Sequence, residues 1–378
     1  MTATADNTIA VANLQQHELI QKDNFNYLLQ YGTDLGVSDF FIGSQRPVKG
    51  ELHGRMEYLT NFDVTLEYCT AIAQIIYGSS GISARLVGEG LACSYQFRVQ
   101  NKLYRYRVNM MKTNRGMIIV MRPLSSIPPK LSSIGVEQEI VDALELLCDH
   151  KKDSLKGKLF LVAGETGSGK STLIASLIRY LLEESYLREN GFVIYTAEAP
   201  IEYTYNEVDE GRSVIEQVEN FKGFKTFSGA IRDYMRMSPK IINVGETRDF
   251  ETLDAVLQAS NTGHVAITTI HANSVAQIIT RMIDLIPAKF RTDGEKKRVL
   301  ESLGVTVFQK LIPTKLKNGK RGRVAVREYL IFTPEVQAFL LPHINGDLVG
   351  AVEQCVAQFG RSYAQHFAEL VNEGVIDG

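Results

Sequence analysis

The chain has 378 residues, of which 44% are apolar and 22% charged, and its formal net charge is −2. This length exceeds what one hydrophobic core usually organises, so we expect two domains in an ordinary globular protein. The near-neutral charge excludes a general electrostatic attraction to nucleic acids or anionic membranes. Four cysteines lie far apart without a CxxC pair, which argues against a zinc site or a disulfide framework and favours a reducing cytosol.

The N-terminus has neither the basic start nor the apolar core of a secretory signal, and no run of 18 apolar residues occurs. We therefore expect a cytoplasmic protein. Residues 1–20 are small and polar, which predicts a flexible tail.

Residues 21–123 predict a small α/β domain. Leu66, Cys69, Ile72 and Ile76 recur at helical spacing and predict a helix that stops at Gly78. Residues 94–111 then alternate with period two: Tyr104, Tyr106, Val108 and Met110 share one face, and Arg105, Arg107 and Asn109 share the other. This alternation predicts a half-buried antiparallel hairpin.

Residues 124–136 predict an extended linker, because the segment from 123 to 135 holds three prolines and four serines. Beyond it, in residues 137–378, apolar strands alternate with helices. We predict strands over 159–163, 192–198, 240–246 and 264–271, and helices from Lys170, over 251–263 and over 274–287. Continuous apolar strands separated by helices indicate a parallel sheet covered on both faces.

The first of these strands leads into "GETGSGKS", residues 164–171, a glycine-rich loop followed by a helix. Glycines let backbone N–H groups converge on phosphate oxygens, and the positive end of the helix faces the same anion. Lys170 supplies a cation for the β and γ phosphates, and the Ser171 hydroxyl can bind Mg²⁺. The pattern predicts an ATP and Mg²⁺ site built from Gly164, Glu165, Thr166, Gly167, Ser168, Gly169, Lys170 and Ser171.

Phosphate hydrolysis also needs a carboxylate at the end of a second strand. In "KIINVGETRD", Gly245 occupies the usual Asp position and Glu246 follows it, so we predict that Glu246 polarises the attacking water. Glu198, at the end of the neighbouring strand, is the nearest acid for the metal, with a turn or capping role as the alternative. Glu202 lies beyond Pro200, and a structural role is equally compatible with its position.

Two histidines flank the strand over 264–271. Thr269 and His271 should emerge at the ligand edge of the sheet, where an imidazole can sense the γ-phosphate. His264 should lie at the other end of the strand. For each histidine a purely structural role is the alternative.

Four segments, "GETGSGKST", "EAPIEY", "INVGETRD" and "TGHVAITTIHANS", resemble the boxes of the secretion ATPase superfamily, which includes type II and type IV secretion ATPases and pilus retraction motors. Within it the likeness is greatest to the DotB/TraJ-type ATPases of type IVB secretion and conjugation systems. Two departures stand out: Ala199 replaces the second acid of the acidic box, and the four-cysteine module of the type II branch is missing.

The resemblance implies a PAS-like N-terminal domain, a RecA-like P-loop domain with a helical C-terminal segment, and a hexameric ring at the cytoplasmic face of a secretion machine. It implies that Lys170, Ser171 and Thr172 bind phosphate and Mg²⁺. It also implies that Glu198 belongs to the acidic box, Glu246 is the catalytic carboxylate, and His264 and His271 form a histidine box. Among the N-terminal arginines that reach the nucleotide in the family, Arg107 and Arg122 match best, with Arg115 behind them. From the residues alone, Arg107 is equally compatible with a solvated hairpin face.

We therefore expect a hexameric ATPase that powers export through inner-membrane components of a secretion apparatus. Its substrates would be proteins or DNA–protein complexes delivered indirectly, without sequence-specific nucleic-acid binding. Two alternatives stay open: a nucleotide-gated scaffold with little hydrolysis, since Gly245 and Ala199 both remove expected acids, and a DNA-translocating motor, which the neutral charge disfavours.

Overall fold

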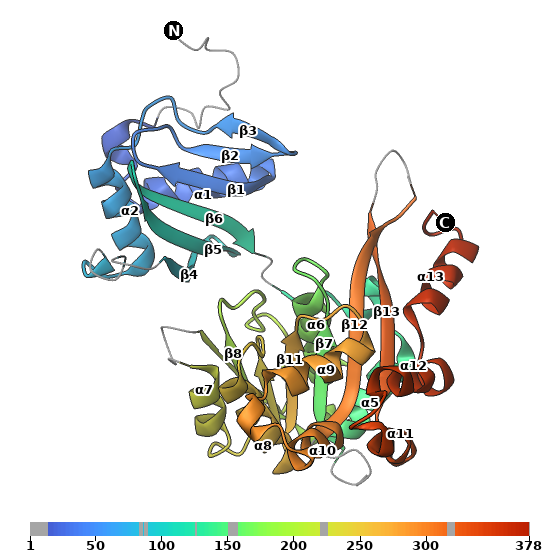
Figure 1. Ribbon diagram of the computed structural model, residues 1–378. Coiled ribbons are helices and arrows are strands. Elements are labelled where there is room, and N and C mark those ends of the chain that lie inside the picture. Colours follow the sequence, from blue (N-terminus) through green and yellow to red (C-terminus); the bar gives the residue numbers. More distant parts are fainter. Residues whose placement is uncertain are drawn as a thin grey trace. The chain divides into compact units, whose positions relative to one another are not determined.

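The computed structural model describes residues 14–82, 86, 90–124, 127–149, 158–219, 226–315 and 322–377. The chain divides into two compact units, one within 1–126 plus 199–202 and the other within 127–198 plus 203–378 (Figure 1). Most of the predicted N-terminal tail, residues 1–13, lies outside the described ranges. Within those ranges, no helix combines the length and the apolar character that a membrane crossing requires.

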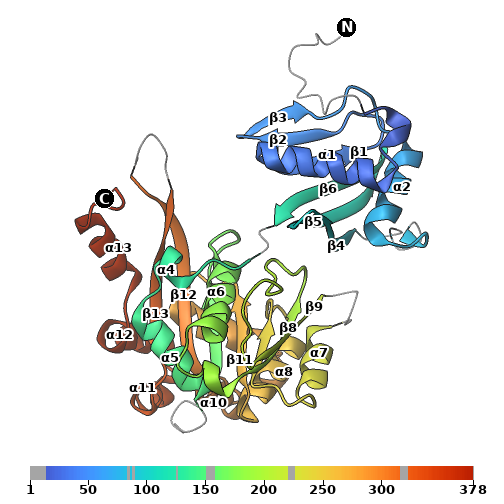
Figure 2. The ribbon, with the colours of Figure 1, turned by 180° about the vertical axis from the view of Figure 1, so that it is seen from behind.

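The first unit is a small PAS-like α/β domain with an antiparallel sheet in the order β3-β2-β1-β6-β5-β4. Helices α1 and α2 pack on this sheet (Figure 2), and one apolar core joins helices and strands. Its elements are α1 (Lys22–Leu35), β1 (Val37–Gly43), β2 (Lys49–Leu52), β3 (Arg55–Tyr58), α2 (Leu66–Tyr77), β4 (Leu91–Val99), β5 (Lys102–Thr113) and β6 (Gly116–Leu124).

The predicted helix with period 3.6 is α2. Thr65 caps its first turn by accepting a hydrogen bond from the N–H of Tyr68, and Gly78 ends it in the left-handed conformation with φ of 73°. Cys69, Ile72 and Ile76 are buried as the spacing predicts. Leu66 is half-exposed instead, because it is the first residue of the helix and lies at the edge of the apolar stripe.

The predicted hairpin is β4 and β5, and β6 continues the antiparallel sheet. Tyr104, Tyr106, Val108 and Met110 are all buried, which confirms the core-facing side of β5. Arg107 of β5 is the direct partner of Arg122 on β6. Residues directly opposite in an antiparallel pair share a face, so the two arginines predicted to act together lie on one side of this sheet.

The second unit is a RecA-like domain whose sheet has the order β13-β12-β7-β11-β10-β8-β9. Strands β12, β7, β11, β10, β8 and β9 run parallel, which confirms the predicted parallel sheet, and β13 is antiparallel to β12. The strands are β7 (Leu159–Ala163), β8 (Val193–Glu198), β9 (Val214–Glu219), β10 (Ile241–Val244), β11 (Val265–Ile270), β12 (Leu303–Pro313) and β13 (Arg323–Ile331). Strands β9, β12 and β13 were not predicted.

Helices cover both faces of this sheet. Alternate residues of β7 belong to different apolar clusters: Leu159 and Leu161 pack toward α8 and α9, whereas Phe160 and Val162 pack toward α5 and α6. The helices are α4 (Leu131–Ile134), α5 (Gln138–Cys148), α6 (Lys170–Glu183), α7 (Phe227–Tyr234), α8 (Phe250–Asn261), α9 (Val275–Leu285), α10 (Asp293–Ser302), α11 (Pro334–Leu340), α12 (Leu348–Phe359) and α13 (Tyr363–Asn372).

The segment predicted as an extended linker contains the short helix α4. Leu131 of this helix is buried in the same apolar cluster as Ile140 of α5, so this part of the segment belongs to the second unit. An apolar residue among serines and prolines is a weak local signal, and its burial depends on the distant sheet that it covers. After β13, α11, α12 and α13 complete the unit.

Candidate active site

The loop of residues 164–169 joins the end of β7 to the start of α6. Gly164, Gly167 and Gly169 have φ of 150°, 81° and 85°, a region that L side chains rarely adopt. Two of them are also sterically confined. A Cβ on Gly164 would lie 2.4 Å from the backbone oxygen of Gln309, and one on Gly169 would lie 2.9 Å from Nε2 of the same residue. The backbone therefore adopts the tight curl that an anion-binding loop needs.

Lys170 begins α6, and its ammonium group lies over the loop. Nζ donates hydrogen bonds to the carbonyl oxygens of Gly164 at 2.7 Å and Glu165 at 2.8 Å. Ser171 is exposed beside it, and the hydroxyl of Thr172 is 2.9 Å from that of Tyr203. The helix begins with a lysine and an exposed serine at its positive end, and this arrangement favours phosphate binding.

Glu246 follows β10 and lies between an imidazole and a guanidinium. Its Oε1 is 3.2 Å from Nε2 of His271, which follows β11, and its Oε2 is 2.5 Å from Nη2 of Arg248. The carboxylate is 17% exposed, against 49% for His271 and 74% for Arg248. The hydrogen bond from Arg248 to Glu246 raises the pKa of the guanidinium. The structure thus brings together the two residues predicted as catalytic base and phosphate sensor.

Threonines fix the two strand ends that carry this pair. The hydroxyl of Thr269 donates to the carbonyl oxygen of Gly245 at 2.7 Å, and the N–H of Thr247 donates to the carbonyl oxygen of Thr269 at 2.9 Å. The hydroxyls of Thr247 and Thr268 are 2.9 Å apart, and all three threonines are buried. Thr269, predicted at this edge, therefore holds the backbone before Glu246.

Glu198 is the last residue of β8, next to β10 in the sheet. Its Oε1 accepts hydrogen bonds from the Thr196 hydroxyl at 2.7 Å and from Nε2 of Gln217 at 3.1 Å. Burial first, and then the charge of Glu198, raise the pKa values of Tyr205 and Tyr234. The sequence placed Glu198 correctly at a strand end, and it missed Gln217 because β9 was not predicted.

The structure does not bring His264 to the glycine-rich loop. His264 precedes β11, and its Nδ1 is 2.9 Å from the carbonyl oxygen of Pro239, whereas His271 follows the same strand. Six strand residues separate the two histidines by about 20 Å. The expected separation is thus present, and His264 lies at the opposite end of the sheet from Lys170.

The two predicted arginines belong to the first unit. Arg122 forms a bidentate ion pair with Asp39, with Nε 2.8 Å from Oδ1 and Nη2 3.1 Å from Oδ2. This pair raises the pKa of Arg122, whose side chain is 65% exposed. Arg107, its neighbour across the strands, is half-buried. Arg115 is exposed.

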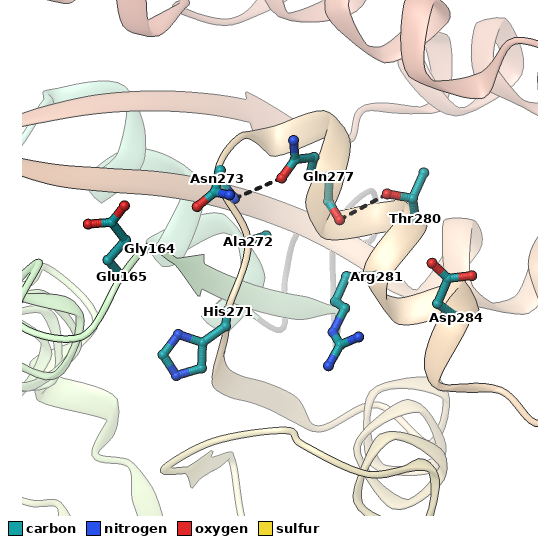
Figure 3. Close-up of a pocket in the computed structure, with 9 residues that line it drawn as sticks. All are labelled: Gly164, Glu165, His271, Ala272, Asn273, Gln277, Thr280, Arg281 and Asp284. Atoms are coloured by element: carbon teal, nitrogen blue, oxygen red, sulfur yellow. Dashed lines mark hydrogen bonds between the residues drawn. The ribbon is translucent and has the colours of Figure 1, made fainter.

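A pocket of about 340 Å³ opens beside the glycine-rich loop (Figure 3). Gly164 and Glu165 line one side of it, and His271, Asn273 and Arg281 line the other. The N–H of Asn273 donates to Oε1 of Gln277 at 3.2 Å, which ties the loop after β11 to α9. Arg281 and Asp284 also line the pocket and were not predicted. Their spacing from Gln277, four and then three residues, is that of one polar helix face and could have indicated them.

These residues fit a nucleotide with a divalent cation. The positive-φ glycines, the N-terminus of α6 and the lysine Nζ match phosphate oxygens. Ser171, Glu198 and Glu246 offer hydroxyl and carboxylate oxygens, the donors that Mg²⁺ prefers.

A glycine-rich loop before a helix and a strand-end carboxylate, on a RecA-like sheet, define a P-loop ATPase. A family model described as "Type II/IV secretion system protein" matches residues 92–343. The chain belongs to this family of ATPases.

Individual relatives agree with this assignment. The Pseudomonas aeruginosa type IV pilus retractation ATPase PilT is 33% identical over 288 residues, which are 76% of this chain and 76% of PilT. Among solved structures, the Legionella pneumophila ATPase DotB aligns with a TM-score of 0.86 and 30% identity over 98% of this chain and 97% of DotB. The pilus retraction motor PilT with bound ADP aligns with a TM-score of 0.76 and 25% identity, over 96% and 95% of the two chains.

Proposed function

We propose that the chain is the ring-forming cytoplasmic ATPase of a type IVB-like secretion or conjugation system. The observation that carries the proposal is the likeness to the Legionella pneumophila DotB, which covers 98% of this chain at 30% identity and a TM-score of 0.86. The four sequence boxes, which resemble those of the secretion ATPase superfamily, support an export ATPase. Hydrolysis would drive motion between the two units through the segment that joins them.

The P-loop residues Gly164 to Thr172 hold the phosphates of ATP, with Lys170 leaving the loop carbonyls to contact the β and γ phosphates. Ser171 and Glu198 would hold Mg²⁺, which supplies charge neutralisation on the phosphates. Glu246 accepts the proton of the water whose oxygen attacks the γ-phosphorus, and the bond to the departing ADP oxygen breaks. His271, 3.2 Å from Glu246, orients that carboxylate.

A homohexamer would complete this site. In the proposed ring, Arg107 and Arg122 of the first unit reach a nucleotide. His264 precedes β11 and would act away from the P-loop of its own chain. Arg122 would exchange its ion pair with Asp39 for a phosphate. The ring would dock on inner-membrane components of the apparatus, and exported proteins or DNA–protein complexes would reach it indirectly.

The test measures assembly and turnover on the full chain. Light scattering with an ATP analogue and Mg²⁺ should give a mass near six subunits, and phosphate release should fall about a hundredfold or more in Glu246→Gln while ATP binding persists. A monomer at micromolar concentration with nucleotide bound would exclude the ring. Turnover unchanged by Glu246→Gln would support a nucleotide-gated scaffold, and a large, salt-sensitive stimulation by DNA would support a DNA motor.

A further inference from the structure

A glutamine from a distant strand touches the P-loop at three points. Gln309 of β12 donates a hydrogen bond from Nε2 to the carbonyl oxygen of Ser168 at 2.6 Å. Its backbone oxygen and its Nε2 are the atoms that a Cβ on Gly164 or Gly169 would strike. Gln309 is only 2% exposed, so water does not compete for these contacts. The backbone of Gln309 thus packs against the beginning of the loop, and its side chain packs against the end.

Arg327 on the neighbouring strand fixes the orientation of the Gln309 amide. Arg327 is the direct partner of Gln309 across β12 and β13, and its Nε donates to Oε1 of Gln309 at 2.7 Å. A guanidinium can only donate, so the amide oxygen must face Arg327 and the NH₂ group must face Ser168. Arg327 is itself immobilised: it is 1% exposed and donates to Glu137 at 3.1 Å and to the carbonyl oxygen of Gly135 at 2.5 Å.

We propose that Gln309 is a positioning residue for nucleotide binding, which holds the Ser168 carbonyl away from the phosphates so that the loop's N–H groups can face them. A carbonyl oxygen that turned toward the phosphate oxygens would repel them, and the hydrogen bond from Gln309 fixes the Ser168 carbonyl toward β12 instead. The inference rests on the proposed P-loop site and adds a residue outside every sequence box. Arg327 acts through Gln309 and orients its amide.

The contacts predict a split in the kinetic constants. A backbone loop binds phosphates alike in the substrate and in the transition state, so a misplaced loop raises KM and leaves kcat largely unchanged. Two variants of the full chain distinguish the loss of the hydrogen-bond donor to Ser168 from an effect of added charge and from a loss of stability. Gln309→Glu keeps an oxygen for Arg327 and loses the donor to Ser168, whereas Gln309→Met loses both contacts without adding charge.

The matched control is Thr306→Val on the same strand. Thr306 is fully buried, and its hydroxyl has no hydrogen-bond partner in the described part of the chain. Lys170→Ala tests the site itself. We measure the Kd of ADP by calorimetry, KM and kcat from phosphate release, and the thermal midpoint.

Both Gln309 variants should raise Kd and KM roughly tenfold, since one buried hydrogen bond is lost. Values of kcat should stay within about threefold, and Gln309→Glu should melt within about 3 °C of wild type because Arg327 stays paired. Thr306→Val should bind as wild type. Wild-type affinity in Gln309→Glu would overturn the positioning role, and weak binding in Gln309→Glu alone would show an effect of charge and overturn the donor role. If Lys170→Ala binds ADP normally, the P-loop site itself fails, which is a separate outcome.

Discussion

Nε2 of His271 lies 3.2 Å from Oε1 of Glu246, although 25 residues separate them and each follows a different strand. The parallel pairing of β10 with β11 brings the two strand ends together, and hydrogen bonds of Thr247 and Thr269 fix them there. Glu246 is mostly buried while His271 is half-exposed. The imidazole can therefore move toward a ligand while the carboxylate stays in place.

This relationship predicts unequal roles for the two histidines. His271→Gln should lower kcat about tenfold, because a positioned imidazole no longer orients the base. His264→Gln should lower kcat less, since the ring of His264 contacts Pro239 at the other end of β11. Steady-state phosphate release on both variants makes the comparison. A larger loss in His264→Gln would contradict it.

The two glutamates around Pro200 should also differ. Glu198 is anchored at the end of β8 by Thr196 and Gln217 and faces the strand edge shared with Glu246, whereas Glu202 groups with the first unit. Glu198→Gln should retain the fold and nucleotide binding and lose turnover by about a hundredfold, because an amide holds Mg²⁺ less well than a carboxylate. Glu202→Gln should cost much less.

The measurement is ATP turnover of Glu198→Gln and Glu202→Gln over a Mg²⁺ titration. Excess Mg²⁺ should restore part of the activity of Glu198→Gln. If Glu202→Gln is the inactive variant and Glu198→Gln behaves as wild type, the metal assignment is wrong.

Local patterns were sufficient to predict the P-loop, its strand and helix, and the parallel orientation of the central strands. Each rests on neighbouring residues: the glycines precede Lys170, and strands such as residues 159–163 are continuously apolar. Glu246 and Glu198 could be placed because the carboxyl ends of parallel strands meet at one edge.

The remaining features depend on contacts between distant residues. Strands β12 and β13 carry the buried polar side chains Gln309 and Arg327, which interrupt an apolar pattern. Their burial is compensated by Ser168, 141 residues away, and by Glu137, 190 residues away. Strand β9 lies at the sheet edge and buries only Ile215 and Glu219, so its apolar signal is weak. Single-sequence periodicity contains none of these partners.

The P-loop glycines predict a contrast between two alanine substitutions. Gly169→Ala places a Cβ 2.9 Å from Nε2 of Gln309 at a φ of 85°, so the loop must shift, and ADP affinity should fall roughly tenfold or more. Gly374→Ala meets a similar φ of 71° with nothing within 4 Å of the new Cβ. It should cost about 1 kcal/mol of stability and leave ADP affinity unchanged. Calorimetric titration with ADP tests both, and equal losses of affinity would refute the steric argument.

The last prediction concerns His366 of α13. Its ring is buried, and Nδ1 accepts a hydrogen bond from the N–H of Arg327 at 3.0 Å. Burial lowers the pKa of His366; the charges of Arg361 and Arg327 lower it further, and Glu137, 3.1 Å from Nδ1, offsets part of this effect. The folded-state pKa thus lies below the unfolded value of about 6.5.

The sign of the pH dependence follows from this difference. Above about pH 6.5 the ring is neutral in the folded and the unfolded chain and does not change stability. As the pH falls below that value, the unfolded chain binds a proton and the folded chain does not. Stability is therefore lost until the pH has passed the folded-state pKa. The thermal midpoint should therefore fall less between pH 7.5 and pH 5.5 in His366→Gln than in wild type. His17→Gln removes an exposed histidine and should follow the wild type. If His366→Gln loses as much stability on acidification as wild type, the buried ring is not the group that carries this part of the acid sensitivity, and the carboxylates of the chain account for it instead.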